Sequence, residues 1–267
     1  MKSSPKGSRQ RLDVLLVERG LAESRGRAQG LILSGSVRVG ERVVTKAGSR
    51  ISADEPLSVA QNERFVSRAG EKLDAAIDAF GVRVEGRSCL DAGASTGGFT
   101  DALLQRAAQR VLAVDVGYGQ FDWALRNDPR VTVLERTNVR RLTGEDLTFD
   151  PDLLVADLSF ISLVVALESI FSTTPSLREA ILLVKPQFEA GPGAVGRGGL
   201  VRDREVHTAV ILDVAKFFGS LDFGAVGVMR GAVAGRKSGN LEYPVHLVRG
   251  AEPTLDEACI REVVAGG

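Results

Sequence analysis

The sequence predicts an α/β protein in which a largely parallel sheet, covered by helices on both faces, follows a small α+β unit. Seven short apolar runs recur from residue 88 onward, and helix-like segments such as EKLDAAIDAF (71–80) separate most of them. A glycine-rich turn follows the first run, and the residues before this region are more basic. The seven expected strands are 88–92, 111–115, 131–134, 152–157, 180–184, 224–229 and 243–248.

The smaller unit is expected within the first sixty residues, as two helices and a small antiparallel sheet. RLDVLLVERG (11–20) places its leucines on one side of a short helix, and Ser24 is a typical N-cap for a second helix. VRVGERVV (37–44) alternates around Gly40 and Glu41, which is the pattern of a tight hairpin. Residues 57–59 add a further strand to this unit.

Composition divides the chain. The polar stretch 61–70 predicts a linker, so we expect a disordered tail at 1–9, a first unit at 10–60 and a body at 71–267. Residues 1–72 carry 14 Lys and Arg against 8 Asp and Glu, whereas the remainder carries 20 against 26. A basic head on an acidic body predicts that a polyanion contacts the head.

Several classes of protein are disfavoured. Cys89 and Cys259 cannot form a disulfide framework and indicate a reducing, cytoplasmic setting. His207 and His246 have no Cys or His at ligand spacing, so no metal site is predicted. The basic N-terminus has no apolar segment typical of a signal peptide. The most apolar stretch, 160–167, is far shorter than the roughly twenty residues of a membrane span, so no membrane partner is expected.

LDAGASTGGFTD (90–101) follows an apolar strand and opens a helix, which predicts a ligand cradle of backbone amides at a helix N-terminus. A P-loop requires lysine after its second glycine, and Phe99 stands there instead. A dinucleotide site requires GxGxxG, and the segment starting at Gly93 lacks the second glycine. The third candidate ligand is S-adenosylmethionine.

For that ligand, Asp91 would face the methionine amino group, Gly93 would pack beneath it, and Asp115 would accept from both ribose hydroxyls. A carboxylate at the position of Asp115 is shared with nucleotide-binding folds and does not discriminate between them. Asn138 and Asp157 end the next two strand units, at the edge where such sheets bind ligands. The predicted cofactor residues are Asp91, Gly93, Ser95, Thr96, Gly97, Gly98, Phe99, Asp115, Asn138 and Asp157.

Four charged residues are candidates for chemistry at this edge. Asp157 ends a strand, Lys185 directly follows AILLV, Glu242 begins the last strand, and Lys72 starts the helix before the first strand. A ribose 2′-hydroxyl needs help to lose its proton, and a lysine can accept it where burial or a cation lowers its pKa from about 10.4. The alternative for each residue is an ordinary solvated or strand-edge charge.

The head resembles an S4 RNA-binding domain over roughly residues 10–60. The matching stretch is RLDVLLVERGLAESRGRAQGLILSGSVRVGERVV. The resemblance implies RNA contacts from the basic residues of the head, and the scarcity of aromatic residues there favours phosphate or shape recognition over base stacking. The predicted RNA-binding residues are Arg11, Arg25, Arg27, Arg38, Arg42 and Lys46. The alternative is a basic helical domain with solvated arginines.

The body resembles ribose 2′-O-methyltransferases of the FtsJ/RrmJ type, and the whole chain resembles the TlyA family, in which an S4 domain precedes that enzyme. The matching pieces occur in order: SRAGEKL, LDAGASTGGFTD, DVGYGQ, LRNDPRV, VADLSFISL, LVKPQFE and SGNLEY. The resemblance implies a Rossmann-like class I methyltransferase, S-adenosylmethionine as cofactor, and a Lys-Asp-Lys-Glu tetrad at Lys72, Asp157, Lys185 and Glu242. It also implies cytidine in 16S and/or 23S ribosomal RNA as the target, with ribosomal RNA or ribosomal subunits as the partner.

Three other functions are weighed against this one. Members of the TlyA family have been labelled haemolysins, but no segment here is long and apolar enough to span a membrane. A non-catalytic ribosome-binding factor would not need the tetrad, and a small-molecule methyltransferase would not need the basic head. The motif [DNS]-P-P-[YF], typical of amino methylation, is absent after the fourth strand, where DLSF stands. The sequence leaves open whether GPGAVGRGG (191–199) is a lid or a connector, and which oligomer forms.

Overall fold

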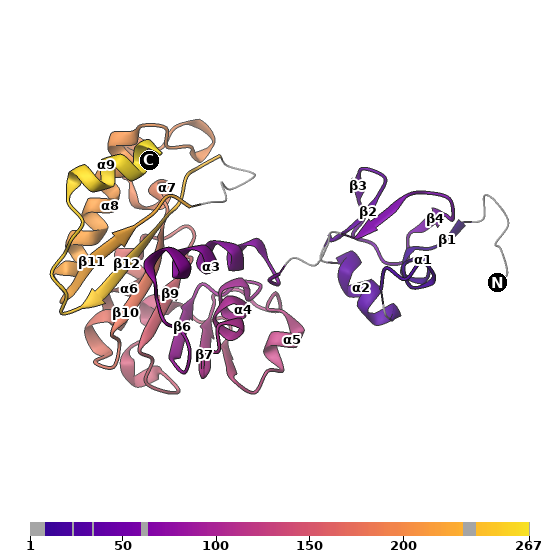
Figure 1. The fold of residues 1–267 in the computed structure, drawn as a ribbon, viewed down its shortest axis with the longest axis horizontal. Helices are drawn as coiled ribbons and strands as arrows, with labels where there is room; N and C mark the ends of the chain where they lie inside the picture. The colour runs from indigo at the N-terminus through magenta and orange to yellow at the C-terminus, as the bar shows by residue number, and fades with distance from the viewer. Residues whose placement is uncertain (1–8, 23, 34, 60–63, 232–238, 267) are drawn as a thin grey trace. The chain divides into compact units, whose positions relative to one another are not determined.

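The computed structural model describes residues 9–22, 24–33, 35–59, 64–231 and 239–266, and the chain divides into two compact units (Figure 1). The first unit ends at Glu63 and the second begins at Arg64. Each unit contains its own cluster of buried apolar side chains. The residues predicted as a tail lie outside the described residues except for Arg9, which belongs to a strand.

The first unit packs two short helices against short antiparallel strands. Its elements are β1 (Arg9–Arg11), α1 (Leu12–Glu18), α2 (Arg25–Leu33), β2 (Val37–Val39), β3 (Arg42–Val43), β4 (Arg50–Ser52) and β5 (Leu57–Val59). β2 pairs with β3, as the hairpin pattern predicts, and also with β5, the further strand expected at 57–59. The pairing of β1 with β4 was not predicted, because strands of three residues show almost no periodicity. Leu12, Leu16, Ala28 and Ile32 form the centre of its core.

The second unit is built on a seven-stranded sheet in the order β11-β12-β10-β9-β6-β7-β8. The strands are β6 (Ser88–Ala92), β7 (Arg110–Val114), β8 (Val131–Leu134), β9 (Leu153–Ala156), β10 (Glu179–Val184), β11 (Phe223–Val228) and β12 (Tyr243–Arg249). β12 is antiparallel to both of its neighbours, and the other strand pairs are parallel. This arrangement confirms the predicted mostly parallel, Rossmann-like sheet.

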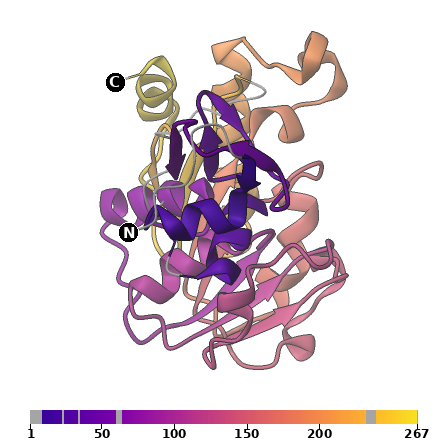
Figure 2. The same cartoon turned by 90° about the vertical axis from the view of Figure 1, so that its right-hand side faces the viewer.

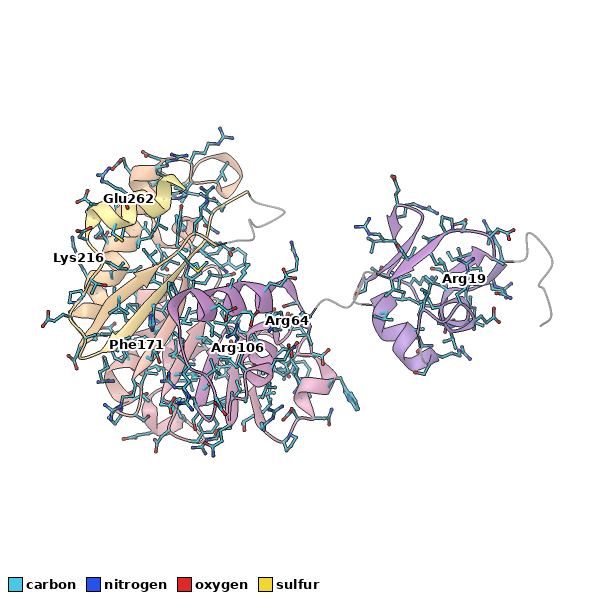
Figure 3. All side chains as sticks on the ribbon, in the orientation of Figure 1. Arg19, Arg64, Arg106, Phe171, Lys216 and Glu262 are labelled. Atoms are coloured by element: carbon cyan, nitrogen blue, oxygen red, sulfur yellow. The ribbon has the colours of Figure 1, made fainter. Side chains whose placement is uncertain are left out.

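Helices cover both faces of this sheet (Figures 1 and 2). The helices are α3 (Arg68–Phe80), α4 (Gly98–Gln105), α5 (Trp123–Arg126), α6 (Leu163–Thr173), α7 (Pro186–Glu189), α8 (Arg204–Gly219) and α9 (Glu257–Ala265). Short 3-10 turns span Val139–Arg141, Gly144–Asp146, Pro192–Ala194 and Arg197–Gly199. Alternate strand residues enter different clusters: Leu90 packs with Ile170 of α6, whereas Cys89 packs with Leu73 of α3. Phe171, labelled in Figure 3, is part of the α6 side.

Helix α3 begins at Arg68, three residues before the predicted start at 71. Residues 64–70, which the sequence places in the linker, therefore lie in the second unit, and Phe65 is buried in its core. The extension is stabilised by close packing of α3 on α4, because a Cβ at Gly70 would lie 2.9 Å from the carbonyl oxygen of Gly98. Arg64 and Arg106, labelled in Figure 3, both pair with Asp74 of α3.

Candidate active site

The glycine-rich loop lies where the order of strands reverses, because β7 and β9 flank β6 on opposite sides. Ligands of open α/β sheets bind at this point, outside the carboxyl ends of the strands. Gly93 follows β6 with φ +88°, and a Cβ at this position would lie 2.8 Å from the carbonyl oxygen of Asp157, after β9. Only glycine allows the two strand ends to approach this closely.

Asp91 is a buried carboxylate at the end of β6. Its Oδ2 accepts a hydrogen bond of 2.7 Å from the hydroxyl of Thr100, whereas its buried Oδ1 has no hydrogen-bond partner among the described residues. Burial raises the pKa of Asp91 to about 7, and the nearby carboxylates of Asp157 and Asp115 add to this rise. A buried acceptor without a donor favours a cationic hydrogen-bond donor as ligand.

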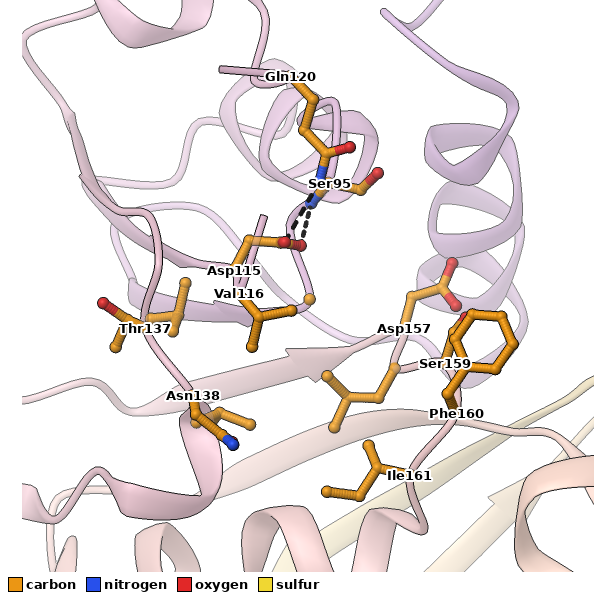
Figure 4. Close-up of a pocket in the computed structure, with 14 residues that line it drawn as sticks. Ser95, Asp115, Val116, Gln120, Thr137, Asn138, Asp157, Ser159, Phe160 and Ile161 are labelled. Carbon is orange, nitrogen blue, oxygen red and sulfur yellow. Dashed lines mark hydrogen bonds between the residues drawn. The ribbon is translucent and has the colours of Figure 1, made fainter. Parts of the chain in front are cut away.

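A cavity of about 450 Å³ opens beside this loop (Figure 4). Its lining comes from the ends of β6, β7, β8 and β9: Gly93, Ser95, Val114, Asp115, Val116, Gln120, Thr137, Asn138, Val139, Asp157, Leu158, Ser159, Phe160 and Ile161. Asp115 ties the loops together, accepting from the backbone of Ser95 at 2.8 Å and of Gly117 at 2.6 Å. The cavity therefore combines apolar walls with fixed carboxylates.

Two lysine–carboxylate pairs lie at the same edge of the sheet. Lys185 Nζ is 2.5 Å from Asp157 Oδ1 and also donates to Leu158 O at 3.0 Å and Ser159 Oγ at 3.1 Å. Lys72 Nζ is 2.5 Å from Glu242 Oε2. All four charged side chains are at least 84% buried, so neither pair is a screened surface pair.

The sheet topology explains why the two pairs lie at one edge of the sheet. Asp157 directly follows β9 and Lys185 directly follows β10, its parallel neighbour. Glu242 directly precedes β12, which is antiparallel to β10, and Val184 pairs with Tyr243 in the ladder. The start of β12 therefore lies at the edge where β9 and β10 end. Lys72 joins them from α3, which packs along this part of the sheet.

The structure brings only part of the predicted cofactor set to the cavity. Gly93, Ser95, Asp115, Asn138 and Asp157 line it. Asn138 also caps the turn at Val139–Arg141, accepting from Arg140 N at 3.1 Å.

The remaining loop residues serve the packing of α4. Phe99 is buried in the core shared with α3, and a Cβ at Gly98 would lie 3.0 Å from that of Ala69. A Cβ at Gly97 would lie 3.2 Å from the Phe121 ring, and the carbonyl oxygen of Thr96 accepts from the backbone of Asp122. These four residues hold the helix N-terminus in place.

Several lining residues were missed from the sequence. Thr137 and Val139 carry no motif beyond their place after a strand. Other lining residues that were not predicted individually lie within the family-matching pieces DVGYGQ and VADLSFISL: Val116, Gln120, Leu158, Ser159, Phe160 and Ile161. Phe160 is the most distinctive, since 91% of it is exposed and its φ is +66°. Its ring contacts that of Phe188 at 5.2 Å, and Lys185 Nζ lies 5.9 Å from the Phe188 centroid. A strained, exposed aromatic residue beside a buried lysine is a feature of functional sites.

The basic residues of the head are of two kinds. Arg11 and Arg25 pair with the buried Asp13, Arg11 through two bonds of 2.9 Å and Arg25 at 3.3 Å. The Arg11 hydrogen bonds hold the pKa of Asp13 well below its ordinary value.

Other cations of the head face outward. Arg42 and Lys46, together with Arg50, line an open groove of about 500 Å³. Arg38 is exposed and donates to Glu41 O at 3.2 Å, and the side chain of Arg27 lies outside the described residues.

Three kinds of feature are absent from the described residues: membrane-spanning helices, groups of metal ligands and disulfides. No helix in this part of the chain is long and apolar enough to cross a membrane. The same residues contain no group of three His, Cys, Asp or Glu side chains that could hold a metal ion. Cys89 and Cys259 are both free thiols, and burial raises the pKa of Cys89 to about 12.

Comparison with known proteins identifies both units. The FtsJ-like methyltransferase family model matches residues 65–249, and the S4 domain model matches residues 10–56. The chain is 49% identical over 237 residues to the 16S/23S rRNA (cytidine-2'-O)-methyltransferase TlyA of Mycobacterium tuberculosis, covering 88% of each protein.

Two further relatives carry a different name. Hemolysin A of Brachyspira hyodysenteriae is 40% identical over 239 residues, which cover 89% of this chain and 99% of that one. The solved structure named "Putative hemolysin from Streptococcus thermophilus" superposes with a TM-score of 0.73 at 37% identity, covering 96% of this chain and 94% of that one.

Proposed function

The chain belongs to the TlyA family of FtsJ-like methyltransferases, and from this premise we propose that it transfers a methyl group from S-adenosylmethionine to the ribose 2′-hydroxyl of cytidine in 16S and/or 23S ribosomal RNA. The observation that carries the proposal is the presence of two buried lysine–carboxylate pairs at the edge of the sheet where the cavity opens, with Asp157 of one pair lining that cavity. An RNA-modifying role also fits the basic S4 domain, and with it we propose a cytoplasmic location.

The side chains in and beside the cavity suit S-adenosylmethionine, independently of the family resemblance. Asp91 is fully buried and does not line the cavity, but it stands two residues before Gly93, which does, and its unpartnered Oδ1 suits the methionine ammonium. Asp115 lines the cavity and suits the two ribose hydroxyls. Val116 and Ile161 provide apolar contact for an adenine ring. When bound, the cofactor supplies an electrophilic methyl group on a sulfonium.

The tetrad residues would handle the proton of the 2′-hydroxyl. Lys185 in its neutral form, after its proton has passed to solvent, accepts that proton at Nζ. Asp157, with Leu158 O and Ser159 Oγ, holds Nζ in one position. Glu242 orients Lys72, whose ammonium stabilises negative charge that develops on the attacking oxygen.

The first test is methyl transfer itself. Purified protein with S-adenosylmethionine and unmodified ribosomal subunits should produce 2′-O-methylcytidine, located by mass-spectrometric mapping of the RNA. Lys185→Ala should abolish transfer and leave the affinity for the cofactor within about threefold, because Lys185 is assigned to the proton of the 2′-hydroxyl and not to the cofactor. The matched control is Lys216→Ala on α8, an exposed lysine labelled in Figure 3, which should retain full activity.

The same preparations decide between the family's two names. Lysis of erythrocytes that wild type and Lys185→Ala cause equally, with no methyl on the RNA of either, would refute the proposal. Binding to ribosomal subunits without methylation by wild type would instead identify a non-catalytic binding factor.

A further inference from the structure

The start of β12 is fastened to the segment that follows the glycine-rich stretch 191–199. Asn240 accepts from the backbone N–H of Val201 through Oδ1 at 3.0 Å. It also donates through Nδ2 to the carbonyl oxygen of Gly199 at 2.8 Å. Asn240 is 3% exposed and stands two residues before Glu242, so this anchor lies on one side of the carboxylate that pairs with Lys72.

A second anchor lies on the other side of Glu242. The hydroxyl of Tyr243 is 2.8 Å from Nδ1 of His207 on α8, and Nε2 of His207 is 3.0 Å from the carbonyl oxygen of Val201. A carbonyl can only accept, so Nε2 of His207 carries a proton and donates to Val201, while Nδ1 forms the hydrogen bond with the tyrosine hydroxyl. Tyr243 is fully buried, and the two rings meet edge to face at 5.6 Å.

Both backbone polar groups of Val201 are thus hydrogen-bonded: its N–H to Asn240, and its carbonyl oxygen to His207, which in turn bonds Tyr243. The side chain of Val201 is itself buried, which makes it a firm anchor. The segment that carries Val201 follows Lys185 and α7 in the chain. The hydrogen bonds of Asn240, His207 and Tyr243 around Val201 form what we call the clamp. The clamp connects the chain segment that follows Lys185 with the start of β12, which Glu242 precedes.

We propose that Asn240, His207 and Tyr243 are positioning residues that fix Glu242 against Lys72 through Val201. The proposal deepens the proposed function and rests on it, because the reaction is what the position of Glu242 serves. Glu242 lies outside the last ladder pair between β10 and β12, at Val184 and Tyr243. Its carbonyl oxygen accepts from the backbone N–H of Gly231 at 2.8 Å, which holds its backbone but does not fix its side chain. A displacement of about 1 Å in such a group can lower a rate a hundredfold.

A purely structural role for the clamp is the competing explanation, and β12 offers a matched control. His246 lies on the same strand and is similarly buried, but its Nε2 contacts Glu179 at 2.7 Å, at the start of β10 and far along the strand from Glu242. Tyr243→Phe removes one hydroxyl and keeps the ring, so it is the mildest break in the clamp. Asn240→Asp, which keeps the acceptor for Val201 and loses the donor to Gly199, is the second variant.

The test is a double-mutant cycle on methyl transfer to ribosomal subunits, with thermal unfolding measured for every variant. Tyr243→Phe should lower kcat about tenfold, with KM for RNA and the cofactor Kd within twofold. In a Glu242→Gln background the same substitution should change kcat by less than twofold. His246→Gln should lower the melting temperature at least as much as Tyr243→Phe and keep kcat within twofold of wild type.

Independent tenfold losses that multiply in the double variant would overturn the proposal, as would an unchanged kcat in both Tyr243→Phe and Asn240→Asp. If wild type transfers no methyl group, the proposed function fails separately. A crystal structure of Tyr243→Phe then decides the positioning: a Glu242 carboxylate displaced from Lys72 supports it, and an unmoved pair overturns it.

Discussion

The effect of Asp91→Asn on the free energy of unfolding should depend on pH. Relative to wild type, the variant should be more stable at pH 8 than at pH 5. In the unfolded chain this carboxyl ionises near its ordinary pKa of 3.8, whereas burial raises its pKa to about 7 in the folded protein. Between these values the folded state holds a proton that the unfolded state has lost, so the free energy of unfolding falls as pH rises from about 4 to about 7. The full shift corresponds to about 4 kcal/mol.

An asparagine side chain has no such dependence on pH. Its amide nitrogen would replace the unpartnered Oδ1 and be unsatisfied as well, at a cost of about 1–3 kcal/mol that does not change with pH. The free energy of unfolding of Asp91→Asn minus that of wild type should therefore rise by about 2.5 kcal/mol between pH 5 and pH 8. Urea unfolding at both pH values measures this difference, and Asp213→Asn, on the exposed side of α8, is the control.

A difference that stays constant from pH 5 to pH 8 would refute the account of Asp91. The same variant tests the ligand. An ammonium partner favours the ionised carboxylate, so binding of S-adenosylmethionine should release a proton below pH 7 and strengthen as the pH rises to 7. Asp91→Asn should weaken binding at least tenfold and remove that proton release, both measured by calorimetry in buffers of different ionisation enthalpy. Equal affinity would remove Asp91 from the cofactor site.

Three further predictions follow from single features. Deleting residues 1–63 should leave cofactor affinity within twofold but reduce methylation of ribosomal RNA at least a hundredfold, and equal methylation by the truncated protein would contradict a role for the head. Phe160→Gly should raise the free energy of unfolding by about 1 kcal/mol by relieving the positive φ, while turnover on RNA falls and cofactor Kd stays constant. Gly98→Ala should destabilise by about 1–3 kcal/mol because its Cβ would meet Ala69 and Gly70 at 3.0 Å, whereas Gly30→Ala on α2 has open space and should stabilise by up to about 1 kcal/mol, both measured by urea unfolding.

The sequence predicts where the strands lie along the chain better than it predicts which strands pair in the sheet. All seven strands of the body are visible as apolar runs, and burial on both faces gives a continuous signal in central strands such as β6 and β9. The position of β12 between β10 and β11 has no local signature, since strand pairing depends on contacts far apart in the chain. That pairing nevertheless decides the site, because it places Glu242 at the edge where β9 and β10 end.

The direction in which a side chain points is the second feature that the sequence does not predict. Gly98 and Phe99 lie within the loop motif, yet Gly98 packs closely against the start of α3 and Phe99 is buried in the core shared with α3. Ile161 lines the cavity from the family-matching piece VADLSFISL, in which only Asp157 was predicted as a site residue. In the head, Arg11 and Arg25 are indistinguishable in sequence from solvated arginines, yet both pair with the buried Asp13. The sequence shows the charge of a residue and not the partner that neutralises it.

The distribution of charge suits two partners of opposite sign. Residues 1–72 carry the excess of Lys and Arg that a polyanion requires, and the acidic body keeps Asp91, Asp115 and Asp157 at the cavity end of the sheet. Three carboxylates near one cavity raise one another's cost of ionisation, as Asp157 and Asp115 do for the pKa of Asp91. A cationic ligand lowers that cost, so these carboxylates should bind a sulfonium cofactor more tightly than its demethylated, uncharged-sulfur product. A binding measurement that finds equal affinity for S-adenosylmethionine and S-adenosylhomocysteine at pH 8 would show that the carboxylates recognise only the ribose and the methionine ammonium, which the two molecules share.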